Sequence, residues 1–264
     1  MSPTVICVRH AQGFHNLGAE FHSLPDPKLT ELGEAQCATL RNSDLIDQTK
    51  ISLVTASPLT RTIATAYLSF EPALKEGKCK RAIIALPDAQ ETSDFPCDTG
   101  SDLDVLRARC EEEKWPVDLS RLGQDWNVKT MESRYSPAGA AVKLRAQAAR
   151  NQVRELLKEL VDAGEEDAQV VLVTHGGYLH YFTDDWEDCN KYYGTGWLNT
   201  ETRAYTYLAG VDSTDEDAAL VETLESRARR GRENSTLTEE EQKELCHTGH
   251  LAWEDQGLGN ALKI

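Results

Sequence analysis

The most informative segment of the chain reads Val170-Val-Leu-Val-Thr-His-Gly-Gly177. Its first five residues form an apolar, mostly β-branched run, which is typical of a strand buried on both faces of a parallel sheet. The run leads directly into His175 and two glycines. Ligand sites of open α/β sheets lie at the carboxyl ends of the strands. The segment therefore predicts a strand with a functional histidine at its end.

A second segment has the same form near the start of the chain. Thr4-Val-Ile-Cys-Val8 predicts a short buried strand, and Arg9 and His10 follow it at once. Further strands are predicted at 51–55, 82–86 and 202–208, and helices at 31–40, from Ser57-Pro58 onward and at 137–163. Ser57 is interpreted as the cap of its helix, with Pro58 at the first helical position. Strands that alternate with helices predict a three-layer α/β/α fold with a largely parallel central sheet.

The sequence also predicts how the chain is divided. Residues 1–210 are expected to form one domain, with an irregular, polar insertion at about 88–133 that caps the site. Residues 211–264 form a charged, partly helical extension, packed on the domain or flexibly attached, with an acidic helix over 236–246. The arginine cluster at 227–232 is interpreted as a solvated face or as an ion-pair partner of the acidic tail.

Composition excludes several classes of function. The 264 residues include 28 Lys and Arg against 44 Asp and Glu, a net charge of −16, whereas nucleic-acid binding needs a basic surface. The sequence has no apolar run of about 18 residues, so no membrane span is expected, and its start does not resemble a secretory signal. Seven scattered cysteines without a CxxC pair favour reduced thiols, a cytoplasmic location and no zinc site.

The candidate site consists of residues that the topology brings to one edge of the sheet. Arg9 and His10 end one strand, and His175 ends another. Arg61 lies in the first turn of the helix that follows the strand at 51–55. Two arginines and two histidines beside a helix N-terminus predict an anion pocket, with a phosphoryl group as the natural ligand. Glu91 follows the strand at 82–86 and can donate a proton to a leaving oxygen. Because a histidine nitrogen can attack phosphorus, the set predicts transfer through a phosphohistidine.

Four ordered motifs resemble those of the histidine phosphatase superfamily, branch 1, also called phosphoglycerate mutase-like. The motifs are Val8-Arg-His-Ala11, Leu29-Thr-Glu-Leu-Gly33, Thr55-Ala-Ser-Pro-Leu-Thr-Arg61-Thr-Ile-Ala-Thr-Ala66 and Val173-Thr-His-Gly-Gly177. Fungal phosphoglycerate mutase-like proteins are the most similar group, on the stretches Gln12-Gly-Phe-His-Asn16 and Pro96-Cys-Asp-Thr-Gly100. Ala11 replaces the usual glycine and adds one methyl group beside the nucleophile.

The resemblance implies a role for each candidate residue. His10 is the nucleophile, while Arg9, Arg61 and His175 bind the phosphoryl oxygens. Glu91 is the general acid and then the base, with Asp88 as its rival. Further phosphate or substrate contacts are expected from Gln12, His15, Asn16 and Gly176. Asp98, Thr99 and Ser101 are expected to line the entrance or to cap a helix. No metal and no cofactor are implied.

The expected function is hydrolysis of a small phosphorylated metabolite by a metal-independent phosphatase. The expected ligands are that substrate or inorganic phosphate, with neither nucleic acid nor membrane as partner, and the sequence predicts no oligomeric state. Three alternatives stay open. They are a phosphoglycerate-type mutase, a fold recruited to other chemistry such as a diphosphate or non-phosphate substrate in a specialised fungal pathway, and a non-catalytic phospho-ligand binder.

Overall fold

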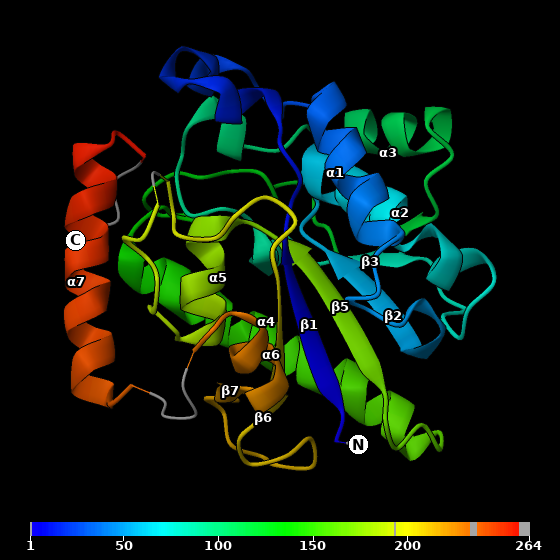
Figure 1. The fold of residues 1–264 in the computed structure, drawn as a ribbon. Helices are drawn as coiled ribbons and strands as arrows, with labels where there is room; N and C mark the ends of the chain where they lie inside the picture. The colour runs from blue at the N-terminus through cyan, green and yellow to red at the C-terminus, as the bar shows by residue number, and fades with distance from the viewer. Residues whose placement is uncertain (1, 193, 233–236, 259–264) are drawn as a thin grey trace.

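A computed structural model describes residues 2–192, 194–232 and 237–258. Its seven-stranded sheet has the order β4-β3-β2-β5-β1-β6-β7, and Figure 1 shows β1 and β5 side by side at its centre. The strands are β1 (Thr4–Arg9), β2 (Ile51–Ala56), β3 (Ile83–Ala85), β4 (Val117–Asp118), β5 (Gln169–Thr174), β6 (Thr202–Tyr207) and β7 (Leu220–Glu222). The pairs from β4 to β1 are parallel, while β6 and β7 join in antiparallel pairs. The predicted α/β fold with a largely parallel sheet is confirmed.

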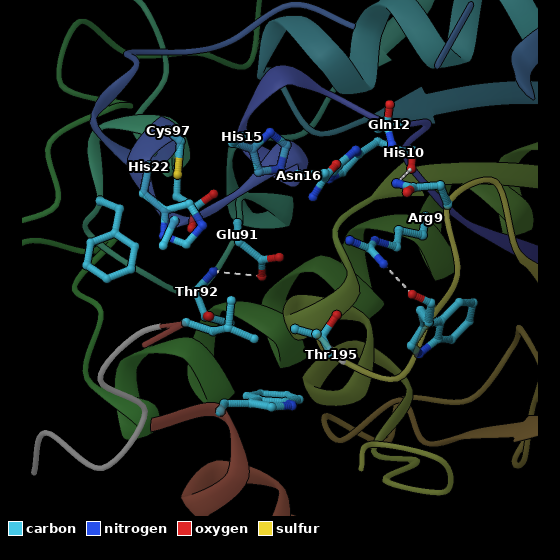
Figure 2. Close-up of a pocket in the computed structure, with 18 of the residues that line it drawn as sticks. Arg9, His10, Gln12, His15, Asn16, His22, Glu91, Thr92, Cys97 and Thr195 are labelled. Atoms are coloured by element: carbon cyan, nitrogen blue, oxygen red, sulfur yellow. Dashed lines mark hydrogen bonds between the residues drawn. The ribbon is translucent and has the colours of Figure 1, made fainter. Parts of the chain in front are cut away.

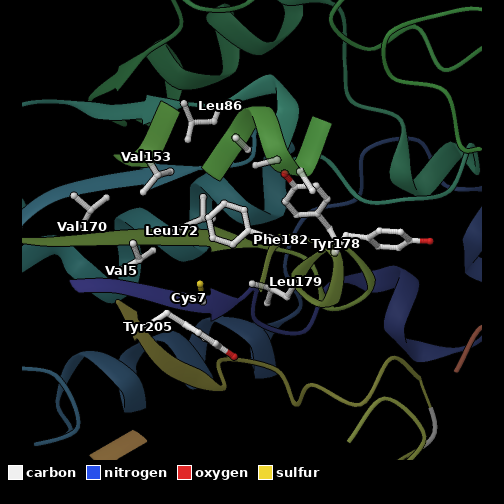
Figure 3. Packing of buried hydrophobic residues seen from close by; sticks show 14 of the residues in the cluster. Val5, Cys7, Leu86, Val153, Val170, Leu172, Tyr178, Leu179, Phe182 and Tyr205 are labelled. Carbon is white, nitrogen blue, oxygen red and sulfur yellow. The ribbon is translucent and has the colours of Figure 1, made fainter. Parts of the chain in front are cut away.

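Helices cover both faces of the sheet. They are α1 (Glu31–Arg41), α2 (Thr60–Lys75), α3 (Leu103–Glu112), α4 (Gly139–Asp162), α5 (Gly176–Thr183), α6 (Leu224–Arg229) and α7 (Glu239–Asp255). Alternate residues of the central strands point to opposite faces. Val170 and Leu172 pack with α4 and α5, whereas Val171 and Val173 pack on the other face with α1 and α2. Figure 3 shows the first of these two cores, in which Val153 of α4 and Phe182 of α5 lie over β5.

The segment predicted as an insertion, at about 88–133, has two parts in the structure. Residues up to Asp98 approach the site, but α3 and β4 pack at the edge of the sheet, where β4 pairs with β3. Apolar residues of 115–126 pack against α2 and β3, and this packing places Val117 beside Ile83 of β3.

The residues after 210 share the sheet and the core with the rest of the chain. β7 pairs with β6, and Trp253 of α7 belongs to the core that α4 and α5 cover. The helix predicted at 236–246 begins at Glu239 and continues to Asp255, behind a Thr238 cap that Glu241 completes. Its predicted first residue, 236, lies outside the described residues. None of the described helices combines the length and the apolar character that a bilayer span requires.

Candidate active site

The carboxyl ends of β1 and β5 lie next to each other and place two histidines together. The strands pair in register, with Arg9 opposite Thr174, so His10 and His175 leave the sheet at the same level. Their ring centroids are 5.2 Å apart, and both side chains are buried. A cavity of about 270 Å³ opens beside them (Figure 2). The predicted pairing of these two strand ends is therefore present in the structure.

Hydrogen bonds fix the proton of His10 on one nitrogen. Its Nδ1 lies 2.7 Å from the carbonyl oxygen of Ala11, which can only accept, so Nδ1 carries the proton. Its Nε2 accepts a hydrogen bond from Arg61 Nε at 3.3 Å. Burial, followed by the charges of Arg61 and Arg9, holds the pKa of His10 well below its usual value. The ring is thus neutral, with the lone pair of Nε2 on the side of the arginines.

Arg61 is fully buried and links the parts of the site. Besides His10, its guanidinium contacts His175 Nδ1 at 3.1 Å, the carbonyl of Cys97 at 2.5 Å and Asp98 Oδ1 at 2.8 Å. Asp98, which lines the cavity, is in turn held by Ser93 Oγ at 2.5 Å. Four contacts in different directions leave the guanidinium one orientation.

The predicted start of the helix that carries Arg61 is wrong by about two residues. The helix begins at Thr60 with Leu59 at the cap position, and Ser57 does not cap it. Instead, Asp26 accepts from the backbone N–H of Thr60 at 2.8 Å, which satisfies an N-terminal donor from a distant loop. This frees the Ser57 hydroxyl to bond His175 Nε2 at 2.8 Å. Ser57 therefore belongs to the candidate site, although its local sequence pattern predicted a helix cap.

Four buried polar atoms around the cavity have no hydrogen-bond partner within the described part of the chain. They are Arg9 Nε, His15 Nδ1, Thr195 Oγ1 and Trp197 Nε1, and all four residues line the cavity. Another nitrogen of the Arg9 guanidinium donates to the carbonyl of Trp197. Buried polar groups are normally paired, so this set marks where a polar ligand binds. Thr195 was not predicted, because it lies in an irregular loop that no motif covers.

Glu91 lines the same cavity and is bound by the start of α5. Its carboxylate accepts from the backbone N–H groups of Tyr178 at 2.8 Å, Gly177 at 3.3 Å and Thr92 at 2.9 Å. Burial, and next the charge of Asp98, nevertheless raise the pKa of Glu91. A raised pKa favours the protonated form of a carboxyl group, which is the form that a general acid needs.

The rival acid, Asp88, lies elsewhere. It is buried and bonds Arg134 Nε at 2.9 Å and Gln152 Nε2 at 2.7 Å, and it does not line the cavity. The backbone at and after Glu91 is held by a buried lysine. Lys129 Nζ donates to the carbonyls of Glu91 and Ser93 at 2.7 Å each. Lys129 was not predicted, because it lies in a polar stretch without a motif.

The remaining predicted contacts are close to His10. The His15 ring is 5.3 Å from that of His10 between centroids, and Gln12 and Asn16 line the cavity. Gln12 Oε1 accepts from Thr30 at 2.8 Å, and Asn16 Oδ1 accepts from the N–H of Gly13 at 3.0 Å. These two side chains therefore already hold the loop after β1.

Gly176 is needed for space. A Cβ at this position would lie 2.0 Å from Thr195 Oγ1 and 3.2 Å from Arg9 Nε. Ala11, by contrast, is accommodated: it is fully buried, and its N–H donates to Thr65 Oγ1 at 3.0 Å. The extra methyl group at Ala11 therefore leaves the backbone of the motif bonded.

One group of acidic side chains outside the cavity lies close together. Among the described residues, one group lies close enough to share a cation, namely Asp185, Glu187 and Glu222. Arg230 already bonds Glu222 at 2.6 Å and Glu187 at 3.1 Å. The group is part of an ion-pair network, and it is separate from the cavity that His10 lines.

Comparison with known proteins gives one strong match and several weaker ones. The model of the histidine phosphatase superfamily (branch 1) matches residues 5–209. Two Arabidopsis thaliana proteins, phosphoglycerate mutase-like protein 1 and a phosphoglycerate mutase-like protein, are each 43% identical to this chain. The matches cover 24% and 25% of this chain, and only about a quarter of those relatives' length, 26% and 28%. The solved structure of mycobacterial hydrolase 2 covers 94% of this chain and 97% of its own, at 17% identity and a TM-score of 0.51, which shows a shared fold.

Proposed function

The chain belongs to the branch 1 histidine phosphatase superfamily, and from this premise we propose that it is a metal-independent phosphatase acting through a phosphohistidine on His10. The observation that carries the proposal is the state of His10 among its neighbours. A neutral ring presents its Nε2 lone pair beside Arg61, and unpartnered donors of Arg9 and Thr195 line the same cavity. A phosphate ester supplies the oxygen acceptors that these donors lack.

In the first step, His10 Nε2 attacks phosphorus. Arg61 Nε donates to that lone pair in the structure, and a phosphoryl oxygen is the better acceptor, so substrate binding frees it. The P–N bond forms and the P–O bond to the leaving group breaks. The leaving oxygen takes the proton of Glu91, whose raised pKa keeps that proton available. Arg9, Arg61 and His175 stabilise the charge on the phosphoryl oxygens.

In the second step, water replaces the enzyme on phosphorus. The Glu91 carboxylate takes a proton from water, the water oxygen attacks phosphorus, and the P–N bond breaks. Inorganic phosphate leaves, His10 returns to its neutral state, and Glu91 is again protonated. The seven cysteines, none of them in a disulfide, support a cytoplasmic setting for this reaction, where thiols stay reduced.

The test is phosphate release from p-nitrophenyl phosphate and phosphorylated metabolites, with EDTA present, by wild type, His10→Ala and His247→Ala. His247 is exposed on α7 and serves as the control. We expect release that survives EDTA, disappears in His10→Ala and is unchanged in His247→Ala. Equal release by the folded His10→Ala protein, or no release from any ester by wild type, contradicts the proposal.

A second pair of variants tests the acid. Glu91→Gln should slow esters of alkyl alcohols far more than p-nitrophenyl phosphate, because p-nitrophenolate leaves without a proton. Asp88→Asn, outside the cavity, should leave that ratio unchanged. An equal loss for both esters in Glu91→Gln would remove the acid assignment.

A further inference from the structure

The part of the cavity beyond the phosphoryl-binding residues includes four large apolar side chains. Chain segments that are far apart in sequence contribute Ala19 and His22, Phe95, Leu198, and Trp253 and Leu258. We call the side chains of Phe95, Leu198, Trp253 and Leu258 the apolar wall. They face the substrate group that remains after phosphate is removed.

Two side chains of the apolar wall, Phe95 and Trp253, are held in place by their neighbours. Phe95 stacks with His22 at a centroid distance of 5.6 Å and an interplanar angle of 24°. Trp253 is buried, its Nε1 donates to the carbonyl of Cys189 at 3.2 Å, and its ring lies 5.7 Å from that of Trp186. A preformed apolar surface binds apolar groups without the cost of ordering side chains.

Charge in the cavity is suited to a single anion. Among the described residues that line it, Arg9 is the one lysine or arginine, and it stands beside His10. The lining also includes two carboxylates, Glu91 and Asp98. A second anionic group on the substrate would therefore meet carboxylates without gaining a cation.

The nearby buried cations cannot supply the missing charge. The guanidinium nitrogens of Arg61 already contact Cys97, Asp98 and the two histidines. Lys129 points its ammonium at two backbone carbonyls, and Arg145 donates to the carbonyls of Asp88, Gln90 and Glu91. None of these three side chains lines the cavity.

We propose that the substrate is the monophosphate ester of a small, uncharged, largely apolar alcohol, and that esters with a second anionic group are rejected. The inference rests on the proposed phosphatase function and names its substrate class. The cavity of about 270 Å³ lies at the lower limit of small-molecule sites, about 300–1,000 Å³, so the alcohol is small. Phosphocarboxylates and bisphosphates, the substrates that a phosphoglycerate-type mutase needs, fall in the rejected class.

The test compares two esters of the same shape that differ in charge, 4-carbamoylphenyl phosphate and 4-carboxyphenyl phosphate. We expect wild type to show a kcat/KM for the carbamoyl ester at least about tenfold above that for the carboxylate, since like charges at a desolvated site are strongly disfavoured. Glycerol 3-phosphate and 3-phosphoglycerate form a second pair, with the same expected order. A carboxylate ester that equals or exceeds its neutral partner overturns the proposed substrate class.

A gain-of-function variant tests the same point from the protein side. Leu198 is 52% exposed at the cavity, so Leu198→Arg adds a cation there without disturbing the core. It should raise kcat/KM for 4-carboxyphenyl phosphate about tenfold and lower kcat/KM for the carbamoyl ester, because the variant loses one side chain of the apolar wall. Leu144→Arg, at a 67% exposed position on α4, is the matched control and should change neither. No gain in Leu198→Arg would show that the missing cation does not set the selectivity.

The outcomes separate this inference from the one on which it rests. If wild type and His10→Ala release no phosphate from either ester, the phosphatase proposal itself fails. If release depends on His10 but favours the carboxylated esters, the phosphatase proposal stands and only the substrate class is wrong.

Discussion

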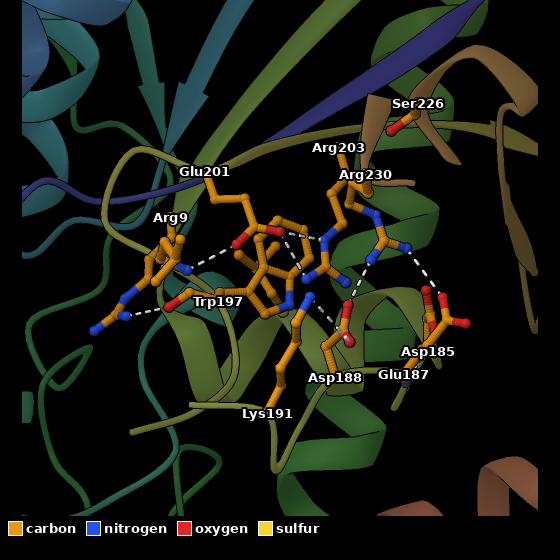
Figure 4. Close-up of polar contacts among 12 residues, drawn as sticks. Arg9, Asp185, Glu187, Asp188, Lys191, Trp197, Glu201, Arg203, Ser226 and Arg230 are labelled. Carbon is orange, nitrogen blue, oxygen red and sulfur yellow. Dashed lines mark hydrogen bonds and ion pairs between the residues drawn. The ribbon is translucent and has the colours of Figure 1, made fainter. Parts of the chain in front are cut away.

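Two regions of the molecule concentrate arginine, and they differ in the partners of the guanidinium groups. At the active site, Arg9 forms no ion pair with a carboxylate among the described residues, and its Nε is buried without a partner. In the second region, which we call the ion-pair cluster, Arg230 bonds Glu222 at 2.6 Å, Asp188 at 2.7 Å and Glu187 at 3.1 Å (Figure 4). Arg227 and Arg232 pair with the same carboxylates.

In this comparison, arginine content alone does not mark the proposed phosphate site; what differs is the number of carboxylates around each guanidinium group. The cluster at 227–232 is much richer in arginine than the site, yet its charges are matched within the protein. It fixes the loop of Glu187 and Asp188 to β7 and α6. A further arginine, Arg203, pairs with Glu201 and lies over the ring of Trp197, 3.8 Å from the ring centroid, while the carbonyl of Trp197 accepts from Arg9.

The largest expected effect comes from removing an active-site cation. Arg9→Met should lower kcat/KM for p-nitrophenyl phosphate about 10²–10³-fold, the usual loss when a donor to transition-state charge is removed. Its free energy of unfolding should change little, because no carboxylate loses a partner. Steady-state kinetics and urea unfolding on one preparation measure both. A stable Arg9→Met enzyme with near wild-type kcat/KM would break the comparison.

The ion-pair cluster should respond in the opposite way. Arg230→Met leaves the buried Glu222 without its shortest ion pair, which should lower the free energy of unfolding by about 3 kcal/mol. The kcat of the folded protein should stay within about twofold, since Arg230 does not line the cavity. Arg229→Met, at the exposed neighbouring position, is the control. Lost activity with unchanged stability in Arg230→Met would mean that the cluster belongs to the site.

Lys129 is a third kind of cation, buried with carbonyl partners alone. Burial lowers the pKa of its ammonium group from 10.5 to about 7. Between these values the unfolded chain binds more protons, so folding stability should rise with pH, by up to about 1.4 kcal/mol per unit. In Lys129→Met this contribution should vanish, while Lys143→Met, at an exposed position of α4, should retain it. Urea unfolding of the three proteins at pH 8 and pH 9 measures the difference. Parallel changes in wild type and Lys129→Met would contradict the lowered pKa.

The smallest expected effect comes from Asp98, which forms an ion pair with Arg61 at the candidate active site and influences the pKa of Glu91. Burial and the Asp98 charge both raise the pKa of Glu91, and the proposed acid must be protonated, so activity should fall as pH rises through that pKa. Asp98→Asn removes one of the two causes and should move this alkaline limb to lower pH by about one unit or less. The pH profile of kcat for an alkyl phosphate measures it. A limb that stays in place or moves upward would separate Asp98 from the acid.

Much of this arrangement could be predicted from local sequence. The apolar runs of β1 and β5 end in histidines, and pattern alone placed those ends at one edge of the sheet. Glu91 and Arg61 followed from their positions after strands. What local pattern could not supply were contacts that depend on distant segments. Ser57 has the sequence of a helix cap, but Asp26, 31 positions earlier, takes that role.

The unpredicted site residues share this cause. Thr195 lines the cavity from an irregular loop, in which its two neighbours, Gly194 and Gly196, both have positive φ. Trp253 belongs to a helix whose composition is acidic, and its burial depends on packing against α5. Neither position carries a local signal of its partner.

The place of α7 has a practical consequence for anyone who attaches something to this protein. Leu258, just past α7, lines the cavity, while the amino end of β1 lies at the opposite end of the strand from His10 (Figure 1). A purification tag or surface linker fused after Ile264 starts six positions beyond Leu258 and is tethered close to the mouth of the cavity. Fused before Thr4, the same tag is held a full strand length away, which leaves the mouth accessible to ester substrates on a chip or column.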